Sequence, residues 1–265
     1  MARHRGRYDP KNSAAYELSR SKVELFVRCP ACFWLDRVGR AHFPSIPGFN
    51  LNSNTDRLLK RDFNQYRGIK PHAVMRKGGL THLRPFAHEH LDLWENSLHF
   101  GLTSDHFNTL HQSTNILFGG GLDDVWENIE TGELHIVDYK STAQLAKDPE
   151  PITLEGIWKE AYKRQMDMYQ WVMRRKGFNV SDTGYFLYVD GQHKGIEGMI
   201  DSADPFTAWM KFDVSILVYE GNDQWVEPIL LEIKELLDSK SCPDHNDSCD
   251  HGRFLQEVAQ LTEDK

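Results

Sequence analysis

The segment GGGLDDVWENIETGELHIVDYKST, residues 119–142, constrains the fold more than any other part of the chain. Residues 122–129 and 134–139 are rich in the β-branched and aromatic side chains typical of strands, and residues 130–133 have the composition of a turn. The segment therefore predicts a β-hairpin with acidic residues at the start of its first strand and an Asp-x-Lys triplet in its second.

The hairpin places its charged side chains by simple geometry. Side chains two residues apart in a strand project from the same face, so Asp138 and Lys140 are expected on one face of the second strand. Val137 and Tyr139 then project from the other face. Folding the hairpin brings Asp123 across to Asp138. Two carboxylates beside one ammonium group suit a divalent cation that activates water next to a phosphate.

Size and composition indicate one globular domain. The chain has 265 residues, 40% hydrophobic and 26% charged, which is ordinary for a soluble protein with one sizeable core. We expect a single domain over residues 18–256, between a flexible basic tail (1–17) and a C-terminal tail (257–265). There is neither an apolar run long enough to cross a bilayer nor a secretory signal pattern, so a cytoplasmic protein without a membrane partner is expected.

The net charge of −8 argues against a general electrostatic attraction to nucleic acid. A local basic track is still compatible with that charge, because a nuclease needs positive charge only along the path of the strand. Basic residues cluster on two expected helices, as Arg57, Lys60, Arg61 and Arg67, and as Lys159, Lys163, Arg164, Arg174, Arg175 and Lys176. The alternative interpretation is two solvated helix faces.

Helical and strand patterns both occur along the rest of the chain. Pro30 is expected to end or kink the first helix. The expected helices cover residues 18–38, 54–66, 88–94, 154–176 and 225–237. The expected strands outside the hairpin cover residues 73–76, 99–102, 116–118, 184–189 and 208–219. Helices before, between and after a mainly antiparallel sheet indicate an α+β or mixed α/β core. The tryptophans Trp158, Trp171 and Trp209 are expected in the core rather than as platforms for base stacking.

Three motifs in order, GGLDDVW, IVDYKST and YKRQMDMYQW, resemble the PD-(D/E)XK nuclease superfamily. The similarity is to its RecB-like branch, which includes CRISPR-associated exonucleases. In that branch a Gly-x-Asp strand precedes an Asp-x-Lys strand, and a helix with Gln-x-x-x-Tyr follows. These elements correspond here to residues 121–123, to residues 138–140, and to Gln165 with Tyr169. The segment SRSKVELFVRCPACFWLDR also resembles the N-terminal helix and Cys-Pro element of such proteins.

The resemblance implies a restriction-endonuclease-like core, with a central mixed sheet flanked by helices. It implies that Asp123, Asp138 and the main-chain carbonyl of Tyr139 hold Mg²⁺ or Mn²⁺, since these cations prefer hard oxygen ligands. Lys140 would then orient the attacking water or stabilise charge on the phosphate. The alternative is that the two aspartates and Lys140 form a structural ion pair on a sheet face.

The resemblance also assigns a role to one helix face and exposes one departure. Gln165 and Tyr169 lie one helical turn apart, and this face would position Lys140 and touch the nucleic-acid backbone. The branch usually supplies a further metal ligand, a His, from an early helix, but residues 54–67 contain no His. Asp56 is the first candidate to replace it and Asp62 the second. Asp56 could equally be an N-terminal helix acid favoured by the helix dipole.

The chain contains four cysteines, Cys29, Cys32, Cys242 and Cys249. A C-x2-C pair near the start and a second pair near the end could together supply four thiolates to a metal site joining the two ends of the domain. Several RecB-like nucleases hold a [4Fe–4S] cluster in this way, with one cysteine in front and three behind. Here the split is two and two, Gly252 stands where a further cysteine would be expected, and His245 and His251 flank the second pair.

Zinc is therefore an alternative to an iron–sulfur cluster at these cysteines. Other interpretations are a redox-active dithiol at residues 29–32, although this pair does not follow a strand, and plain core packing of buried thiols. A structural disulfide is disfavoured in the cytoplasm.

Taken together, the motifs predict a metal-dependent phosphodiesterase acting on nucleic acid, with DNA as the expected substrate. Two aspartates would hold the cation and Lys140 would assist the water nucleophile. The chain contains no helicase motif, so a processive role would require a helicase or another nucleic-acid-processing partner. The alternatives are a non-catalytic nucleic-acid-binding or scaffold protein with the same fold, and a zinc-stabilised protein unrelated to nucleic acid.

Overall fold

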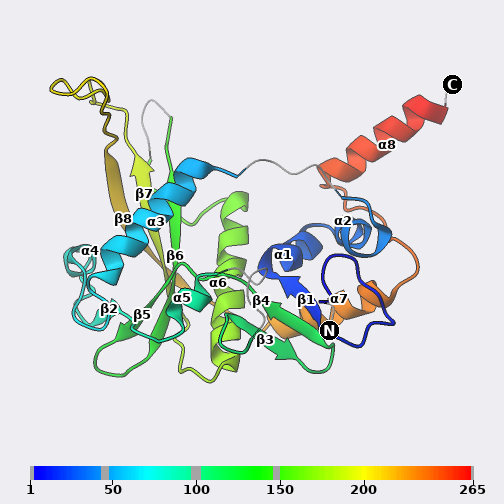
Figure 1. Ribbon diagram of the computed structural model, residues 1–265. Coiled ribbons are helices and arrows are strands. Elements are labelled where there is room, and N and C mark those ends of the chain that lie inside the picture. The colour runs from blue at the N-terminus through cyan, green and yellow to red at the C-terminus, as the bar shows by residue number, and fades with distance from the viewer. Residues whose placement is uncertain (1–2, 43–47, 97–102, 146–149, 264–265) are drawn as a thin grey trace.

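The computed structural model describes residues 3–42, 48–96, 103–145 and 150–263, which form a mixed α/β structure with two sheets (Figure 1). The larger sheet has the strand order β2-β5-β6-β7-β8 and the smaller sheet the order β1-β4-β3. The strands of the larger sheet are β2 (Leu83–Pro85), β5 (Asp124–Asn128), β6 (Leu134–Thr142), β7 (Thr183–Gly191) and β8 (Phe212–Glu220). Those of the smaller sheet are β1 (Tyr16–Ser19), β3 (Asn108–His111) and β4 (Ile116–Gly119).

Strand β6 is the centre of the larger sheet and pairs in both directions. It is antiparallel to β5, so the predicted hairpin is confirmed. It is parallel to β7, and helix α6 (Ile157–Arg175) makes the crossover between the two. Strands β7 and β8 are antiparallel and extend together beyond the rest of the sheet (Figure 1). The expected mixed sheet with flanking helices is therefore present.

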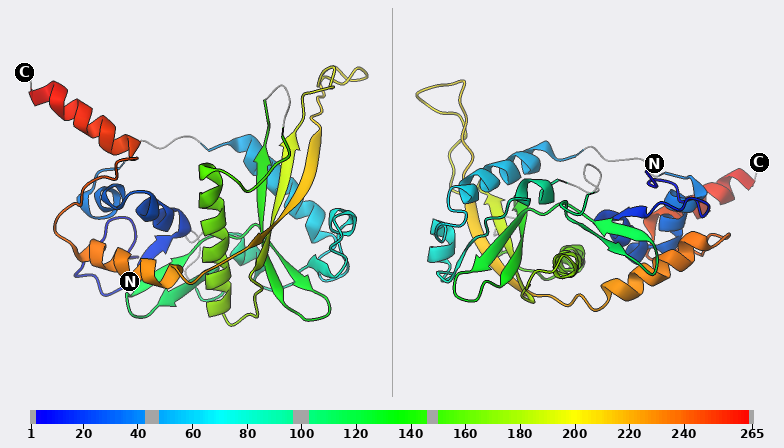
Figure 2. Two further views of the ribbon diagram at one scale, coloured as in Figure 1. Left: turned by 180° about the vertical axis from the view of Figure 1, so that it is seen from behind. Right: turned by 60° about the horizontal axis from the view of Figure 1, so that its bottom comes forward.

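Helices cover both faces of the larger sheet (Figure 2). Helices α3 (Asn50–Asn64) and α4 (Ala73–Lys77) lie on one face and α6 on the other. The side chains buried on the α3 and α4 face are Phe63, Met75, Leu83, Trp126, Val137, Tyr139, Tyr185 and Leu187. Because strand side chains alternate, the neighbours of Val137 and Tyr139 on β6 face α6.

Helix α6 lies between the larger sheet and a second group of elements. That group consists of the smaller sheet, α1 (Arg20–Arg28) and α7 (Val226–Asp238), all of which contact α6. Residues 165–173 of α6 are consecutively buried, since the helix is covered on opposite sides. This burial holds the polar side chains of α6 in fixed positions.

The N-terminal segment, expected to be a flexible tail, packs against the domain from His4 onward. The rings of His4, Tyr8 and Tyr16 pack together with centroids 4.8–5.3 Å apart, His4 stacked on Tyr8 and Tyr16 edge-on to both. The Tyr8 hydroxyl donates a 2.8 Å hydrogen bond to Asp238 at the end of α7. These aromatic side chains bury enough apolar surface to order a segment that its polar composition suggested was free.

The first expected helix is divided by Pro30, as predicted. Helix α1 ends at Arg28, α2 (Pro30–Trp34) begins with the proline, and a π-helical turn, η1 (Leu35–Gly39), follows. Proline fits the first turn of α2 because it has no N–H to donate there. The expected helix started too early, since Tyr16–Ser19 instead form β1, which pairs with β4.

Three expectations between residues 70 and 102 had different outcomes. The strand expected at 73–76 is wrong: these residues form α4, where the His72 ring accepts a hydrogen bond from the Val74 N–H and caps the helix. The helix expected at 88–94 is shorter, α5 (Leu91–Trp94). The strand expected at 99–102 lies outside the described residues.

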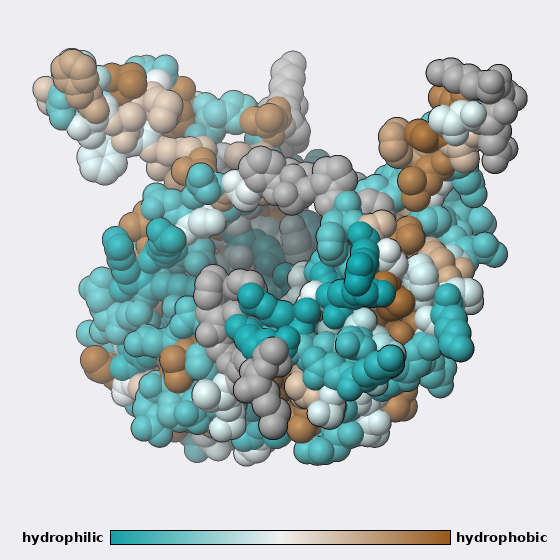
Figure 3. Space-filling view, turned by 45° about the vertical axis from the view of Figure 1, so that its right-hand side comes forward, coloured by the Kyte–Doolittle hydropathy of each residue, from teal (hydrophilic) through white to brown (hydrophobic). Residues whose placement is uncertain are grey.

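The C-terminal tail expected at 257–265 is largely helical. Helix α8 (Asp250–Glu263) projects away from the domain (Figures 1 and 2). In the space-filling view, the surface is hollowed between this projection and that of the β7–β8 hairpin, and hydrophilic side chains dominate the face (Figure 3). Among the helices that the structure describes, none is long and apolar enough to cross a membrane.

Candidate active site

The β5–β6 register brings two acidic side chains together at one end of the hairpin. Asp124 pairs with Val137, so the preceding Asp123 lies opposite Asp138. The carboxylate of Asp123 accepts a 2.9 Å hydrogen bond from the backbone N–H of Tyr139. This bond fixes Asp123 across the hairpin, at the position expected from the sequence.

Asp138 is buried, with only 2% of its side chain exposed, and it faces α6. The Gln165 amide donates a 2.7 Å hydrogen bond to Asp138 Oδ1, and Asp138 Oδ2 forms an ion pair with the Lys140 ammonium. Burial raises the pKa of Asp138 to about 7, with Lys140 opposing the rise and Asp123 adding to it. The site therefore disfavours a negative charge on Asp138 beside that of Asp123 unless positive charge compensates it.

Lys140 lies on the same face of β6, with 16% of its side chain exposed. Burial lowers the pKa of Lys140, but Asp138 and Asp123 outweigh burial and raise it. Its ammonium nitrogen lies 4.6 Å from the centre of the Tyr162 ring, one of the aromatic groups of α6. Lys140 is therefore a protonated lysine that pairs with Asp138, lies against the Tyr162 ring and feels the charge of Asp123.

Tyr169 lies on the same side of α6, where it is buried against the Gly119–Gly121 segment. A Cβ placed on Gly120 would lie 2.6 Å from the Tyr169 hydroxyl, so Gly120 leaves room for the ring. Burial raises the pKa of the Tyr169 hydroxyl, which also interacts with Arg20. The structure thus brings Gln165 and Tyr169 to the same site as the two aspartates.

Asp56 lies on α3 close enough to Asp123 for their charges to interact. Burial raises the pKa of Asp56, and Asp123 raises it further. Asp56 forms an ion pair with Lys60 at 3.4 Å and is in the second turn of α3, not the first. The helix-terminus interpretation of Asp56 therefore does not apply. Asp62, the second candidate, is exposed on the same helix.

Lys60 and Glu95 belong to this site, although sequence reasoning gave neither of them a place in it. The Lys60 ammonium lies 3.4 Å from Asp56 and 3.7 Å from Glu95. Asp123 and Asp56 raise the pKa of Lys60 against the effect of burial, which is the largest single influence and lowers it. The i, i+4 spacing of Asp56 and Lys60 could have indicated this pair, whereas Glu95 is distant in sequence.

Asp124, next to Asp123, is bonded to other side chains of the protein core. Its fully buried carboxylate accepts hydrogen bonds from the Trp126 indole at 3.1 Å and the Tyr139 hydroxyl at 2.7 Å. It also forms an ion pair with Arg67 at 2.8 Å. Asp124 therefore points to the α3 face of the sheet, away from Asp138. Arg67, which we expected on a basic helix face, is therefore paired with Asp124 instead.

Most of the basic residues on α6 are paired within the protein. The ion pairs are Lys163 with Glu160, Arg164 with Glu24, Arg174 with Asp182 and Asp223, and Arg175 with Glu227. Lys159 differs, because its ammonium lies 2.9 Å from the Tyr188 hydroxyl and over the Tyr162 ring, close to Lys140. Burial lowers the pKa of Lys159, and Lys140 lowers it further.

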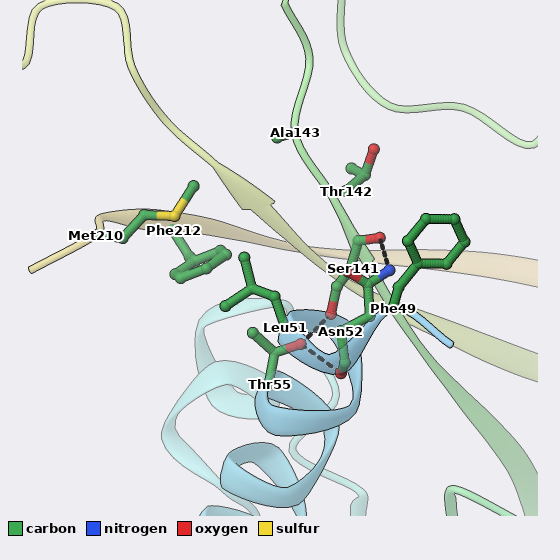
Figure 4. A pocket seen from close by; sticks show the side chains of 9 residues that line it. All are labelled: Phe49, Leu51, Asn52, Thr55, Ser141, Thr142, Ala143, Met210 and Phe212. Atoms are coloured by element: carbon green, nitrogen blue, oxygen red, sulfur yellow. Dashed lines mark hydrogen bonds between the residues drawn. The ribbon is translucent and has the colours of Figure 1, made fainter. Parts of the chain in front are cut away.

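A pocket of about 280 Å³ continues the site along β6 (Figure 4). It begins one residue after Lys140, and its lining residues are Phe49, Leu51, Asn52, Thr55, Ser141, Thr142, Ala143, Met210 and Phe212. The Thr55 hydroxyl donates a 2.8 Å hydrogen bond to the Asn52 carbonyl and also contacts the Ser141 hydroxyl. The pocket therefore lies between α3 and β6, next to the charged residues.

Two of the tryptophans expected in the core are exposed. Trp158 at the start of α6 is 80% exposed and Trp209 before β8 is 69% exposed, whereas Trp171 is buried. The core prediction was wrong for the first two, because the first turn of α6 and the segment before β8 extend beyond the packed layers. Exposed indole rings are suited to stacking against bases.

Three cysteines and one histidine form a second candidate site. Cys29, Cys32, His245 and Cys249 place their ligand atoms within 4.8 Å of one another. Among the described residues, no other group of three or more metal-ligating side chains is as close together. Asp56, Asp123 and Asp138 therefore do not form such a group. The group joins the start of α2 to the segment before α8, so the expected link between the two ends of the domain is present.

Cys242, expected as the fourth thiolate, lies outside this group. It is exposed, and its sulfur contacts the Ala31 carbonyl at 3.8 Å. His245 completes the group instead, beside a turn in which the Cys249 N–H donates to the Asn246 carbonyl. Burial would raise the pKa of Cys29, but hydrogen bonds from backbone groups and His245 outweigh it and hold the pKa at about 6.

The chain matches the PD-(D/E)XK nuclease superfamily over residues 55–251, well over half of its length, and it belongs to that superfamily. The matched region contains Asp56, both strands of the hairpin and helix α6. No curated protein and no solved structure matches the chain. The superfamily consists of metal-dependent nucleases, so the fold and the membership point to hydrolysis of phosphodiester bonds.

Proposed function

We propose that the protein is a Mg²⁺- or Mn²⁺-dependent nuclease of the RecB-like branch that hydrolyses DNA at the β5–β6 site. The observation that carries the proposal is the meeting of Asp123, Asp138 and Lys140 on the face of the sheet covered by α6. A structural ion pair would need one carboxylate for one ammonium. Here a second carboxylate, Asp123, lies beside the pair, and burial together with Asp123 raises the pKa of Asp138 although Lys140 opposes the rise.

The chemistry of the donor atoms, which are carboxylate and carbonyl oxygens, fits a hard divalent cation. Asp123 and Asp138 would hold the ion, with the Tyr139 carbonyl and Asp56 as further oxygen donors. When bound, such a cation supplies Lewis acidity to the phosphate and makes water more acidic. The pKa of both Asp56 and Asp138 is raised by burial and by Asp123, which supports a site completed by positive charge.

The side chains around the carboxylates have separate tasks in this proposal. Lys140 keeps its proton because Asp138 and Asp123 raise its pKa, so it can donate hydrogen bonds to the attacking water or to the charge that develops on the phosphate. Gln165 holds Asp138 Oδ1 and fixes the orientation of the carboxylate. Tyr169, buried beside Gly120, supports the loop that precedes Asp123.

A nucleic-acid strand is the substrate that the surroundings favour. Lys140 and Lys159 supply positive charge at the site, while the rest of the α6 basic residues named above are paired internally. Phe49, at the pocket beside Lys140, and Trp158, at the start of α6, expose aromatic rings. Local charge combined with exposed rings is the combination used to bind single strands.

The test is a cleavage assay with purified protein on end-labelled single- and double-stranded DNA and RNA, with Mg²⁺, Mn²⁺ or EDTA. We expect cleavage of DNA with either cation, none with EDTA, and a loss of at least 100-fold in rate for Asp138→Asn. Binding of DNA without cleavage under every cation would support the non-catalytic scaffold instead. The absence of both binding and cleavage would contradict any nucleic-acid function.

A further inference from the structure

The cysteine–histidine group has the dimensions of a site for one metal ion. Cys32 Sγ lies 3.4 Å from Cys249 Sγ. His245 Nδ1 lies 3.4 Å from Cys29 Sγ, 3.7 Å from Cys32 Sγ and 3.5 Å from Cys249 Sγ. Around a tetrahedral zinc ion with Zn–S bonds of about 2.3 Å and Zn–N bonds of about 2.0 Å, neighbouring ligand atoms are about 3.5–3.8 Å apart. These four separations lie within about 0.4 Å of those edges.

The same separations are too short for an iron–sulfur cubane. In a [4Fe–4S] cluster each ligand binds a different iron, and the whole cluster lies between the ligands. The four ligand atoms must then stand well apart, whereas here all of them lie within 4.8 Å of one another. The geometry also excludes Cys242, which a cluster with four thiolates would need.

Each ligand is held by local structure. The Cys29 N–H donates to the Leu25 carbonyl at the end of α1, and the Cys29 carbonyl accepts from Phe33, which sets the Cys-Pro-Ala-Cys turn. The Gly252 N–H donates to Cys249 Sγ at 3.4 Å. A Cβ at Gly252 would lie 2.5 Å from His245 Cβ, so the glycine at this position leaves room for the histidine.

The segment that carries His245 and Cys249 has little else to hold it. Residues 239–249 are exposed or half-buried throughout. The local core beneath them contains only Cys29, Ala31 and Cys32, with Leu25 and Cys249 packed against it. Three side-chain hydrogen bonds outside the cysteine–histidine group also cross this junction: from Asn246 to the Arg28 carbonyl, from the Trp34 indole to the Ser239 carbonyl, and from the Cys242 thiol to the Ala31 carbonyl. A segment with so little apolar burial is typical of one that a metal ion orders.

We propose that Cys29, Cys32, His245 and Cys249 bind a single structural zinc ion, with His245 coordinating through Nδ1. The ion fastens the segment before α8 to the junction of α1 and α2. Four protein ligands leave no position for water, as in structural rather than catalytic zinc sites. The site is separate from the carboxylates of the hairpin and its occupancy does not depend on nuclease activity.

The test is metal analysis of the full-length protein purified without oxygen, together with its absorption spectrum. We expect one zinc per chain, no visible iron–sulfur absorption, and tetrahedral thiolate spectra after replacement by Co²⁺. Cys32→Ser and His245→Ala should each lose most of the bound zinc, while Cys242→Ser should retain all of it. His245→Cys supplies a fourth thiolate and should restore one zinc, which separates loss of a ligand from loss of folding.

Several results would overturn the proposal. Iron with inorganic sulfide in the purified protein would do so, as would a protein that contains no metal and takes up none. Zinc lost in Cys242→Ser but retained in His245→Ala would show that Cys242, and not His245, is the fourth ligand. His251 Nδ1 lies 3.8 Å from Cys32 Sγ, so zinc retained in His245→Ala but lost in His251→Ala would also refute the assignment.

Discussion

The side-chain amide of Gln165 donates a 2.7 Å hydrogen bond to Asp138 Oδ1, linking the middle of α6 to the central strand of the sheet. The bond holds one oxygen of a buried carboxylate while Lys140 contacts the other. Gln165 is therefore a positioning residue, and its effect on function should pass through Asp138.

Replacing Gln165 by Ala should raise the Mg²⁺ concentration needed for half-maximal cleavage and lower the rate roughly 10–100-fold, the usual cost of losing a partner of a metal ligand. The measurement is cleavage rate against Mg²⁺ concentration. Gln65→Ala is the control, because Gln65 is exposed on the surface next to α3. An unchanged Mg²⁺ dependence in Gln165→Ala would show that this bond does not orient the carboxylate.

Asp123 and Asp124 are adjacent acids that should respond in opposite ways to substitution. Asp124→Asn removes the charge partner of Arg67 in a buried pair and should lower the free energy of unfolding by about 3 kcal/mol. Asp123→Asn should leave stability within about 1 kcal/mol of wild type and abolish cleavage. Urea unfolding and cleavage assays on both variants measure this. A catalytically inert Asp123 would be incompatible with the proposed site.

Gly120→Ala should destabilise the protein by about 1–3 kcal/mol, the usual range for an overpacked core. The new Cβ would lie 2.6 Å from the Tyr169 hydroxyl and 2.7 Å from its ring, so the ring must move. Gly198→Ala is the matched control, since a Cβ there meets nothing within 4 Å. Urea unfolding of both variants measures the difference in their free energies of unfolding. Equal stability of the two would mean that Tyr169 is not packed against Gly120.

Asp36 should contribute stability that depends on pH. Burial opposes its ionisation, but Arg37, Lys22 and His42 donate hydrogen bonds to its carboxylate and lower its pKa from 3.8 to about 2. A carboxyl with a lowered pKa in the folded state stabilises the protein at pH values above its unfolded pKa, and this contribution disappears as pH falls through the folded pKa.

The free energy of unfolding of Asp36→Asn should therefore be roughly 2 kcal/mol below that of wild type at pH 7. The difference should shrink as pH falls from about 4 through 2, because wild-type Asp36 becomes neutral over this range. Denaturant unfolding of both proteins across this range measures it. A difference that stays constant with pH would mean that the charge of Asp36 is not what stabilises the fold.

Local patterns were sufficient for the parts of the site that lie on regular elements. Alternation along β6 predicted that Asp138 and Lys140 share one face, and the antiparallel hairpin predicted that Asp123 meets Asp138. The i, i+4 spacing placed Gln165 and Tyr169 on one helix face. These relationships depend on strand and helix geometry alone, so a sequence is enough to derive them.

Other parts depend on contacts between distant segments, and no periodicity reveals them. Asp124 is structural because Arg67 reaches it from another element. His245 replaces Cys242 as a candidate ligand because of the path of an irregular segment. The run at residues 73–76 is too short for its hydrophobic periodicity to distinguish a helix from a strand. The structure has a helix there, and His72 caps its N-terminus.

The central claim is that Lys140 acts beside two carboxylates in a cation-dependent nuclease site, and single-turnover cleavage of DNA by Lys140→Ala tests it most directly. Lys77→Ala, which removes an exposed lysine at the end of α4, is the control for net charge. With unfolding curves like that of wild type, Lys140→Ala should cleave at least 100-fold more slowly in Mg²⁺, while Lys77→Ala should cleave at the wild-type rate. A folded Lys140→Ala that cleaves as fast as wild type would contradict the account.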